Sequence, residues 1–157
     1  MSPLVRARRA SAAPIPISAR ARGVLAAALA ALLLLALGTA SAQARLVMFS
    51  APSHNIGCAI DNGFARCDVA RHTWKAPAKP TSCRLDWGNG MAVGRRGRGA
   101  FVCAGDTTLN PRGAVLPYGR SRSVGSFTCS SRRSGMTCRN GANGHGFTVS
   151  RTVARAF

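Results

Sequence analysis

The sequence predicts an all-β fold, a small antiparallel β barrel or sandwich built from hairpins and held by disulfides. Short segments with strand propensity alternate with Gly, Asn, Pro and Ser after residue 45, and no apolar stripe of helical period runs through that region. All six cysteines follow residue 57, and four of them form two pairs that each enclose eight residues. Such spacing is typical of disulfide-closed hairpins in a small exported domain.

The first 44 residues have the three parts of a signal peptide, the one helical element that we expect. A basic stretch with five arginines and no acid precedes an apolar run over residues 24–37. That run is too short to span a bilayer comfortably, because about 20 residues are needed. Ala42-Gln43-Ala44 then offers a small-x-small cleavage site. We therefore expect a signal peptide over residues 1–44 and one secreted domain over residues 45–157. The alternative is an uncleaved membrane anchor, whereas the mature chain itself should have no transmembrane segment.

Within the secreted domain, segments bounded by turn-forming residues predict nine strands. They cover residues 46–49, 57–60, 64–69, 83–87, 91–93, 100–103, 126–129, 136–139 and 147–150. Glycine-rich stretches at residues 88–90 and 94–99 predict that the chain folds back at both places.

The first cysteine pair fits the geometry of a hairpin. Asn62-Gly63 is a strong two-residue turn signal, and a turn there sets Cys58 opposite Cys67. Counted outward from the pair that closes the turn, these cysteines occupy a non-hydrogen-bonded position, where Cα atoms approach to about 4.5 Å. A disulfide between Cys58 and Cys67 is therefore predicted.

For the second pair, a four-residue loop over residues 132–135 sets Cys129 opposite Cys138, at a hydrogen-bonded position that suits a disulfide less well. Cys83 and Cys103 then pair by elimination. Chain entropy gives each ten-residue ring about 2.7 kcal/mol and the larger ring about 3.3 kcal/mol. The matching rings leave both an ancient duplication and convergence open.

The secreted domain is strongly basic. Residues 45–157 contain 17 Lys and Arg against four Asp and no Glu, a net charge of +13. A field of this size attracts polyanions. The expected partner is an anionic cell-envelope polymer or a protein, and not a specific nucleic acid, which an exported protein rarely meets. The basic loop with Arg95, Arg96 and Arg98 is a candidate ligand-binding site, with a solvated turn as the alternative.

His145 is a second candidate ligand-binding residue, because it lies between two glycines that let a ligand approach the backbone. The alternative is a structural histidine in a tight turn, and His54 lies in a similar turn. We expect Trp74 and Trp87 to pack in the core rather than stack on sugars.

The motifs of several enzyme classes are missing. The sequence has no G-x-S-x-G elbow, no P-loop and no dinucleotide fingerprint. The cysteine pairs enclose eight residues, whereas zinc ligands are usually separated by two to four. We therefore assign no catalytic residue, no metal ligand and no cofactor.

Six short motifs together resemble a family of small exported bacterial proteins that carry one domain of unknown function. The motifs are Phe49-Ser-x-Pro-Ser-x-Asn-Ile-Gly-Cys58, Leu85-Asp-Trp-Gly-Asn-Gly90, Phe101-Val-Cys-Ala-Gly-Asp106, Leu116-Pro-Tyr-Gly119, Thr137-Cys-Arg-Asn140 and Gly144-His-Gly-Phe147. The resemblance covers most of residues 49–151. It implies a cysteine-stapled extracytoplasmic domain and carries over no activity and no site residue.

Taken together, the residues predict a secreted or extracytoplasmic binding module that is not an enzyme and acts through its basic face. One alternative is a secreted hydrolase that uses His145 with an aspartate such as Asp106. Another is an inhibitor of a different enzyme.

Overall fold

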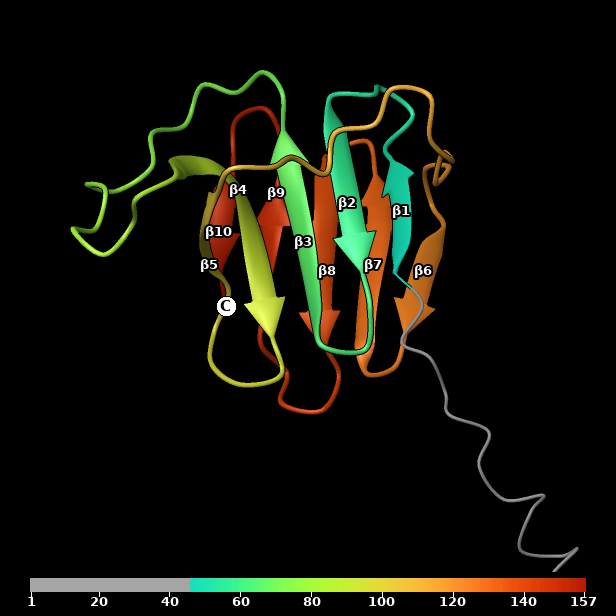
Figure 1. Ribbon diagram of the computed structural model, residues 1–157. Coiled ribbons are helices and arrows are strands. Elements are labelled where there is room, and N and C mark those ends of the chain that lie inside the picture. The colour runs from blue at the N-terminus through green and yellow to red at the C-terminus, as the bar shows by residue number, and fades with distance from the viewer. Residues whose placement is uncertain (1–45) are drawn as a thin grey trace, which may run out of the picture. The chain divides into compact units, whose positions relative to one another are not determined.

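Ten strands form two five-stranded antiparallel sheets in the computed structural model, which describes residues 46–157 (Figure 1). Sheet A contains β1 (Val47–Ser50), β2 (Ile56–Ile60), β3 (Phe64–Val69), β4 (Asp86–Gly94) and β5 (Ala100–Ala104). Sheet B contains β6 (Ser121–Val124), β7 (Phe127–Arg132), β8 (Gly135–Asn140), β9 (Gly146–Val149) and β10 (Ala154–Ala156). The predicted all-β fold is confirmed, and it takes the form of a sandwich. The expected signal peptide lies outside the described residues.

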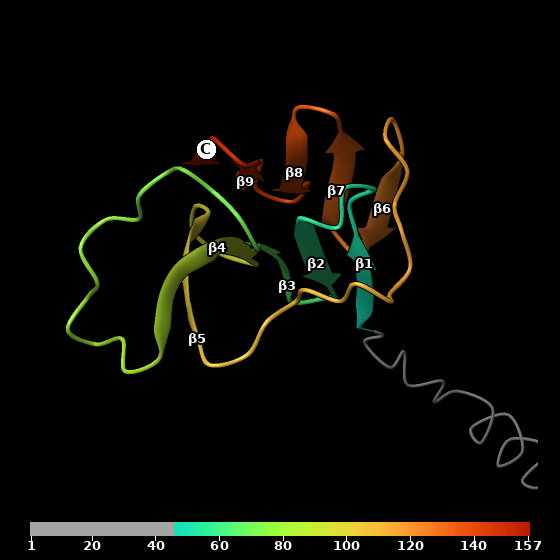
Figure 2. The ribbon, with the colours of Figure 1, turned by 90° about the horizontal axis from the view of Figure 1, so that it is seen from above.

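Each sheet is a simple meander in which every strand pairs with the next one along the chain. The sheets form two layers, with β3 against β8 and β4 against β9 (Figure 2). Inward side chains alternate with outward ones, as the period of two in a strand requires. The largest fully buried side chains include Phe49 and Ile60 from sheet A and Phe127, Met136 and Phe147 from sheet B.

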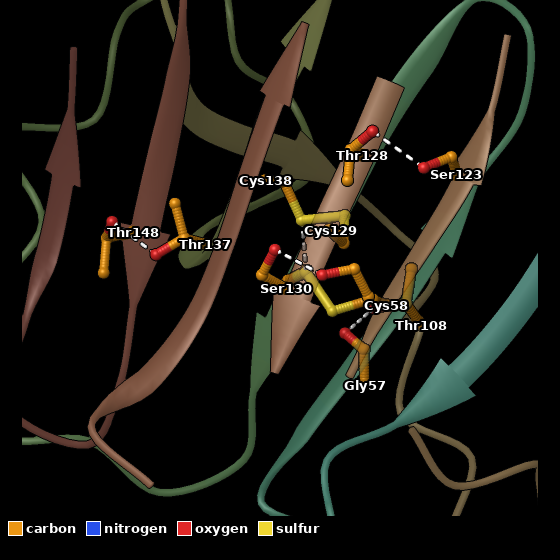
Figure 3. Close-up of a disulfide and its surroundings, with 12 residues drawn as sticks. Gly57, Cys58, Thr108, Ser123, Thr128, Cys129, Ser130, Thr137, Cys138 and Thr148 are labelled. Carbon is orange, nitrogen blue, oxygen red and sulfur yellow. Dashed lines mark hydrogen bonds between the residues drawn. A yellow bond between two sulfur atoms is a disulfide. The ribbon is translucent and has the colours of Figure 1, made fainter. Parts of the chain in front are cut away.

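The three disulfides join Cys58 to Cys67, Cys83 to Cys103 and Cys129 to Cys138. This sequential pairing is the one that the sequence predicts. The first and third lie in equivalent hairpins, β2–β3 and β7–β8, and their four cysteines are fully buried (Figure 3). Sγ of Cys67 and Sγ of Cys138 lie 3.5 Å apart, so the two disulfides touch across the sandwich.

The predicted loop of the β7–β8 hairpin is wrong. The loop has two residues, Arg133 and Ser134, because Arg132 and Gly135 already pair in the ladder. Shifting the closing pair by one residue exchanges hydrogen-bonded and non-hydrogen-bonded positions along the whole hairpin. Cys129 and Cys138 therefore lie at the favourable close position, with Cα atoms 4.0 Å apart, much as Cys58 and Cys67 do at 4.1 Å.

The predicted turn at residues 88–90 is also wrong. β4 runs through this stretch, and its pairing with β5 is irregular between Trp87 and Met91, where Gly88 has a φ of 84°. Gly90 pairs with Asp68 of β3, and a Cβ at position 90 would overlap the Asp68 carboxylate. The glycines that suggested a turn thus serve a bulge and a close side-chain approach.

Two long connections differ in where they run. The segment between β5 and β6 crosses the outer face of sheet A (Figure 2) and bonds to Ser50 through Ala114 and Leu116. The segment between β3 and β4 extends from the sandwich and is attached by Trp74, whose Nε1 donates to the Ser150 carbonyl at 2.9 Å. Both tryptophans are half-buried. Trp74 packs against the core as expected, whereas Trp87 lies outside the core cluster and its Nε1 donates to the Pro77 carbonyl. Within residues 46–157 there is no helix that could span a membrane.

Candidate anion-binding surface

Acidic side chains are confined to one half of the domain. Residues 46–106, which include all of sheet A, contain eight Lys and Arg and all four Asp of the chain. Residues 107–157, which include all of sheet B, contain eight Arg and no Asp, Glu or Lys. The sheet B half therefore carries a side-chain charge of +8 with no carboxylate side chain of its own.

The outer face of sheet B is built from hydroxyl groups and arginines. Successive pairings place one row of residues across all five strands. That row consists of Ser121, Ser130, Thr137, Thr148 and Arg155. A neighbouring row contains Ser123, Thr128 and Arg139. Among the described residues no segment covers this face, and we call it the hydroxyl face.

The hydroxyls of this face bond to each other across the strands. Ser121 and Ser130 lie 2.8 Å apart, Ser123 and Thr128 2.8 Å, and Thr137 and Thr148 3.0 Å. Figure 3 shows two of these pairs beside the buried disulfides. The pattern follows from alternation, because the intervening residues of β7 and β8 fill the core. The hydroxyl side chains are short and uncharged, so the arginines supply the charge of this face and extend beyond the hydroxyls.

The two loops that the sequence analysis singled out lie side by side, at the lower end of the sandwich in Figure 1. Asn140 Nδ2 donates to the Gly94 carbonyl at 3.1 Å, and Asn143 Nδ2 donates to the Arg95 carbonyl at 3.2 Å. Arg95 is held in turn, because its Nε donates to the Asn62 carbonyl at 3.0 Å. Arg96 and Arg98 are exposed, whereas His145 is half-buried.

The opposite end of the sandwich has a pocket of about 280 Å³, which is enclosed by loops that connect the strands of both sheets. Four arginines line it, together with polar and small residues and no carboxylate. The arginines are Arg71, Arg132, Arg133 and Arg151. We call it the arginine pocket.

Three of the four carboxylates line a different groove, of about 430 Å³, on sheet A. There the Arg66 guanidinium bridges two of them, with Nη2 2.8 Å from Asp68 Oδ2 and Nη1 2.7 Å from Asp106 Oδ1. Asp68 is almost fully buried and also accepts hydrogen bonds from the Thr107 hydroxyl and the Thr108 amide. With its oxygens engaged in this way, Asp68 fastens the β5–β6 connection onto sheet A.

This cluster changes the ionisation of its members. Burial by itself would lower the pKa of Arg66, but the hydrogen bonds to Asp68 and Asp106 outweigh burial and raise it. The hydrogen bond from Arg66, followed by its positive charge, holds the pKa of Asp106 below its ordinary value. Both groups therefore stay charged at neutral pH.

Residues 28–157 match the model of a family of unknown function, DUF6636. The chain belongs to the DUF6636 family. No curated protein and no solved structure matches it. Membership in DUF6636 confirms the resemblance to a family of unknown function and assigns neither an activity nor a site.

In this DUF6636 chain no hydrogen bond joins His145 and Asp106, the residues of the alternative hydrolase. Asp106 binds Arg66, and among the described residues no hydrogen bond joins a histidine ring to a carboxylate. The ring of His72 instead stacks on Trp74 at 3.5 Å. Among residues 46–157, three potential metal ligands come close together, the sulfur atoms of Cys58, Cys67 and Cys138. All three belong to disulfides and therefore have no thiolate to offer a metal ion.

Sequence reasoning missed the hydroxyl face and the arginine pocket of this DUF6636 domain. A signal for the first was present, because Phe127-Thr-Cys-Ser130 alternates apolar or sulfur-containing residues with hydroxyl residues. The absence of acids after residue 106 was also visible. The pocket had no local signal, since its arginines come from three separate connections, and Arg71 lies more than 60 residues before the other three in the sequence.

Proposed function

We propose that this DUF6636 protein is an exported, non-enzymatic binding module that holds an anionic cell-envelope polymer on its hydroxyl face. The observation that carries the proposal is the separation of charge, since every carboxylate side chain lies outside the sheet B half. Three disulfides and a signal-like N-terminal sequence support a secreted or extracytoplasmic location, because disulfides persist in oxidising compartments.

The shape of the hydroxyl face suits an extended ligand. Five strands spaced about 4.8 Å apart make a face roughly 20 Å wide, which is long enough for several units of a polymer. Guanidinium groups such as those of Arg139 and Arg155 bind carboxylate and phosphate oxygens through paired hydrogen bonds. The hydroxyl row supplies additional donors and acceptors between them.

Binding to isolated cell envelopes tests the proposal. The oxidised protein is incubated with envelopes at low and high salt, and the bound fraction is measured. Arg139→Gln/Arg155→Gln removes two charges from the hydroxyl face, and Lys79→Gln/Arg84→Gln removes two from the exposed β3–β4 segment as a matched control. We expect about tenfold weaker binding for the first variant, the loss of one charge-assisted hydrogen bond or more. The control should bind nearly as well as the unchanged protein.

The salt dependence separates this proposal from its alternatives. Attraction to a polyanion should fall steeply at high salt, since the screening length shrinks from about 10 Å at 0.1 M to about 3 Å at 1 M. If the hydroxyl-face variant and the control variant lost the same fraction of envelope binding, net charge alone would explain the binding and the hydroxyl face would have no special part in it. If binding survived high salt and disappeared after protease treatment of the envelopes, the partner would be a protein and not an anionic polymer.

The β4–β5 loop, which carries Arg95, Arg96 and Arg98, is a further part of the proposed anion-binding surface. Arg95→Ala/Arg96→Ala/Arg98→Ala should weaken retention on polyanions, whereas His145→Ala should leave it unchanged. A hydrolase would show the reverse pattern, and an enzyme inhibitor would form a stoichiometric complex that survives moderate salt.

A further inference from the structure

We propose that the arginine pocket is a specific site for a single oxyanion group, a phosphate, sulfate or carboxylate carried by a small molecule or by a chain end. The site goes beyond the proposed function, because a free anion can occupy it without any polymer. It is formed at the upper end of the sandwich in Figure 1, where the β1–β2, β3–β4, β5–β6, β7–β8 and β9–β10 connections meet.

The backbone that carries the arginines is held in place. The side-chain amide of Asn55 accepts a hydrogen bond from the Arg71 backbone N–H and donates one to the Arg71 carbonyl, both at 3.0 Å. The Arg151 carbonyl accepts from the Thr73 backbone N–H at 2.8 Å. Arg132 and Arg133 lie at the tight turn of the β7–β8 hairpin. Asn55 is thus a positioning residue, while the guanidinium groups are left to bind.

The charges of the pocket are not balanced within the protein. No carboxylate lines it, and the four guanidinium groups form no ion pair and donate no hydrogen bond within residues 46–157. The Arg133 guanidinium instead lies 5.3 Å from the centre of the Tyr118 ring. Each guanidinium therefore retains its five N–H donors. Four like charges around one hollow repel each other, and a bound anion would relieve that repulsion.

The size of the pocket indicates what it holds. Its volume of about 280 Å³ lies just below the range of about 300–1,000 Å³ that is usual for small-molecule sites. It therefore suits one anionic group and the atoms next to it rather than a large ligand. Arginine is the residue that best matches oxyanions, because its planar fork binds two oxygens at once.

Titration with free anions tests the site directly. Inorganic phosphate, sulfate and acetate are added to the oxidised protein at constant ionic strength, and the arginine Nε–Hε signals are followed by NMR. We expect saturable binding of at least one of the three at one site, and the strongest of them identifies the group. Arg133→Gln/Arg151→Gln should weaken it about tenfold or more, the effect of losing charge-assisted hydrogen bonds.

Two further variants make the test specific. Lys79→Gln/Arg84→Gln removes the same charge from the exposed β3–β4 segment and should leave the affinity unchanged. Arg151→Lys keeps the charge but loses the fork, and it should also bind more weakly. Because the substituted side chains are exposed, each variant should stay folded, and thermal unfolding of each variant checks this.

The proposal is overturned if no anion saturates, if both double variants lose affinity equally, or if Arg151→Lys binds as well as the unchanged protein with each anion. These outcomes are independent of the tests of the proposed function, which alter Arg139 and Arg155 on the hydroxyl face and the three arginines of the β4–β5 loop. Arg132 lines the pocket and also lies on β7 two residues after Ser130 of the hydroxyl face, so it is left unchanged in both experiments.

Discussion

Sheets A and B share one plan but treat their outer faces in opposite ways. Each is a five-stranded meander with a disulfide between its second and third strands. The outer face of sheet A holds the Arg66–Asp68 ion pair and lies under the β5–β6 connection. The outer face of sheet B is uncovered in the described structure and presents paired hydroxyls. The difference is that sheet A uses its outer face to hold a connecting segment, whereas the polar outer face of sheet B holds none among the described residues.

The largest effect should come from reducing all three disulfides, two of which lie in the sheet A half and one in the sheet B half. Their combined contribution of about 8 to 9 kcal/mol rivals the whole stability of an ordinary domain, about 5 to 15 kcal/mol. We expect the reduced protein to lose its near-UV circular dichroism and the dispersion of its amide NMR signals. If one half stayed folded in excess reductant, the sheets would be independent units and the comparison would fail.

The next largest effect should separate the two outer faces. Asp68→Ala leaves the partly buried Arg66 without its best partner and should cost about 3–5 kcal/mol, as breaking other buried ion pairs does. Ser130→Ala, on the hydroxyl face, should cost less than about 1 kcal/mol. Urea unfolding measures both free energies. Similar losses would show that the face of sheet B is as important for stability as that of sheet A.

A smaller effect should follow from changing the hydroxyl face more thoroughly. Thr137→Val/Thr148→Val removes one cross-strand hydrogen bond and keeps the branched shape, so it should change stability by about 0.2–1 kcal/mol. Envelope binding should weaken at the same time. A variant that is destabilised but binds normally would assign the hydroxyls to structure alone.

The smallest effect concerns the exposed end of the ion-pair cluster. Because the folded-state pKa of Asp106 is lowered, its contribution to stability is present above the ordinary value of 3.8 and is lost as the pH falls below it. Urea midpoints measured from about pH 5 down to about pH 2 should therefore drop less steeply in Asp106→Asn than in the unchanged protein. Identical slopes would mean that the Arg66–Asp106 contact adds nothing in solution.

Local signals predicted much of this fold and little of its candidate sites. Asn62-Gly63 predicted the β2–β3 register, which the structure confirms. β6 and β10 were missed, because they are short edge strands whose sequences, SRSV and ARA, lack the usual apolar pattern. The contact between the two candidate loops depends on Asn140 and Asn143, and only the packing of the sheets brings these residues to the β4–β5 loop.

The sulfur atoms of Cys67 and Cys138, in contact between two fully buried disulfides, constrain how the protein can be assembled. In the closed sandwich these atoms are out of contact with solvent, so we expect both hairpins to be oxidised before the sheets close. Each ring is local, and its cysteines are only nine positions apart, so each bond can form as soon as its hairpin emerges. The newly made chain must therefore meet its oxidant while it is still open, and an oxidase that arrived after folding would come too late.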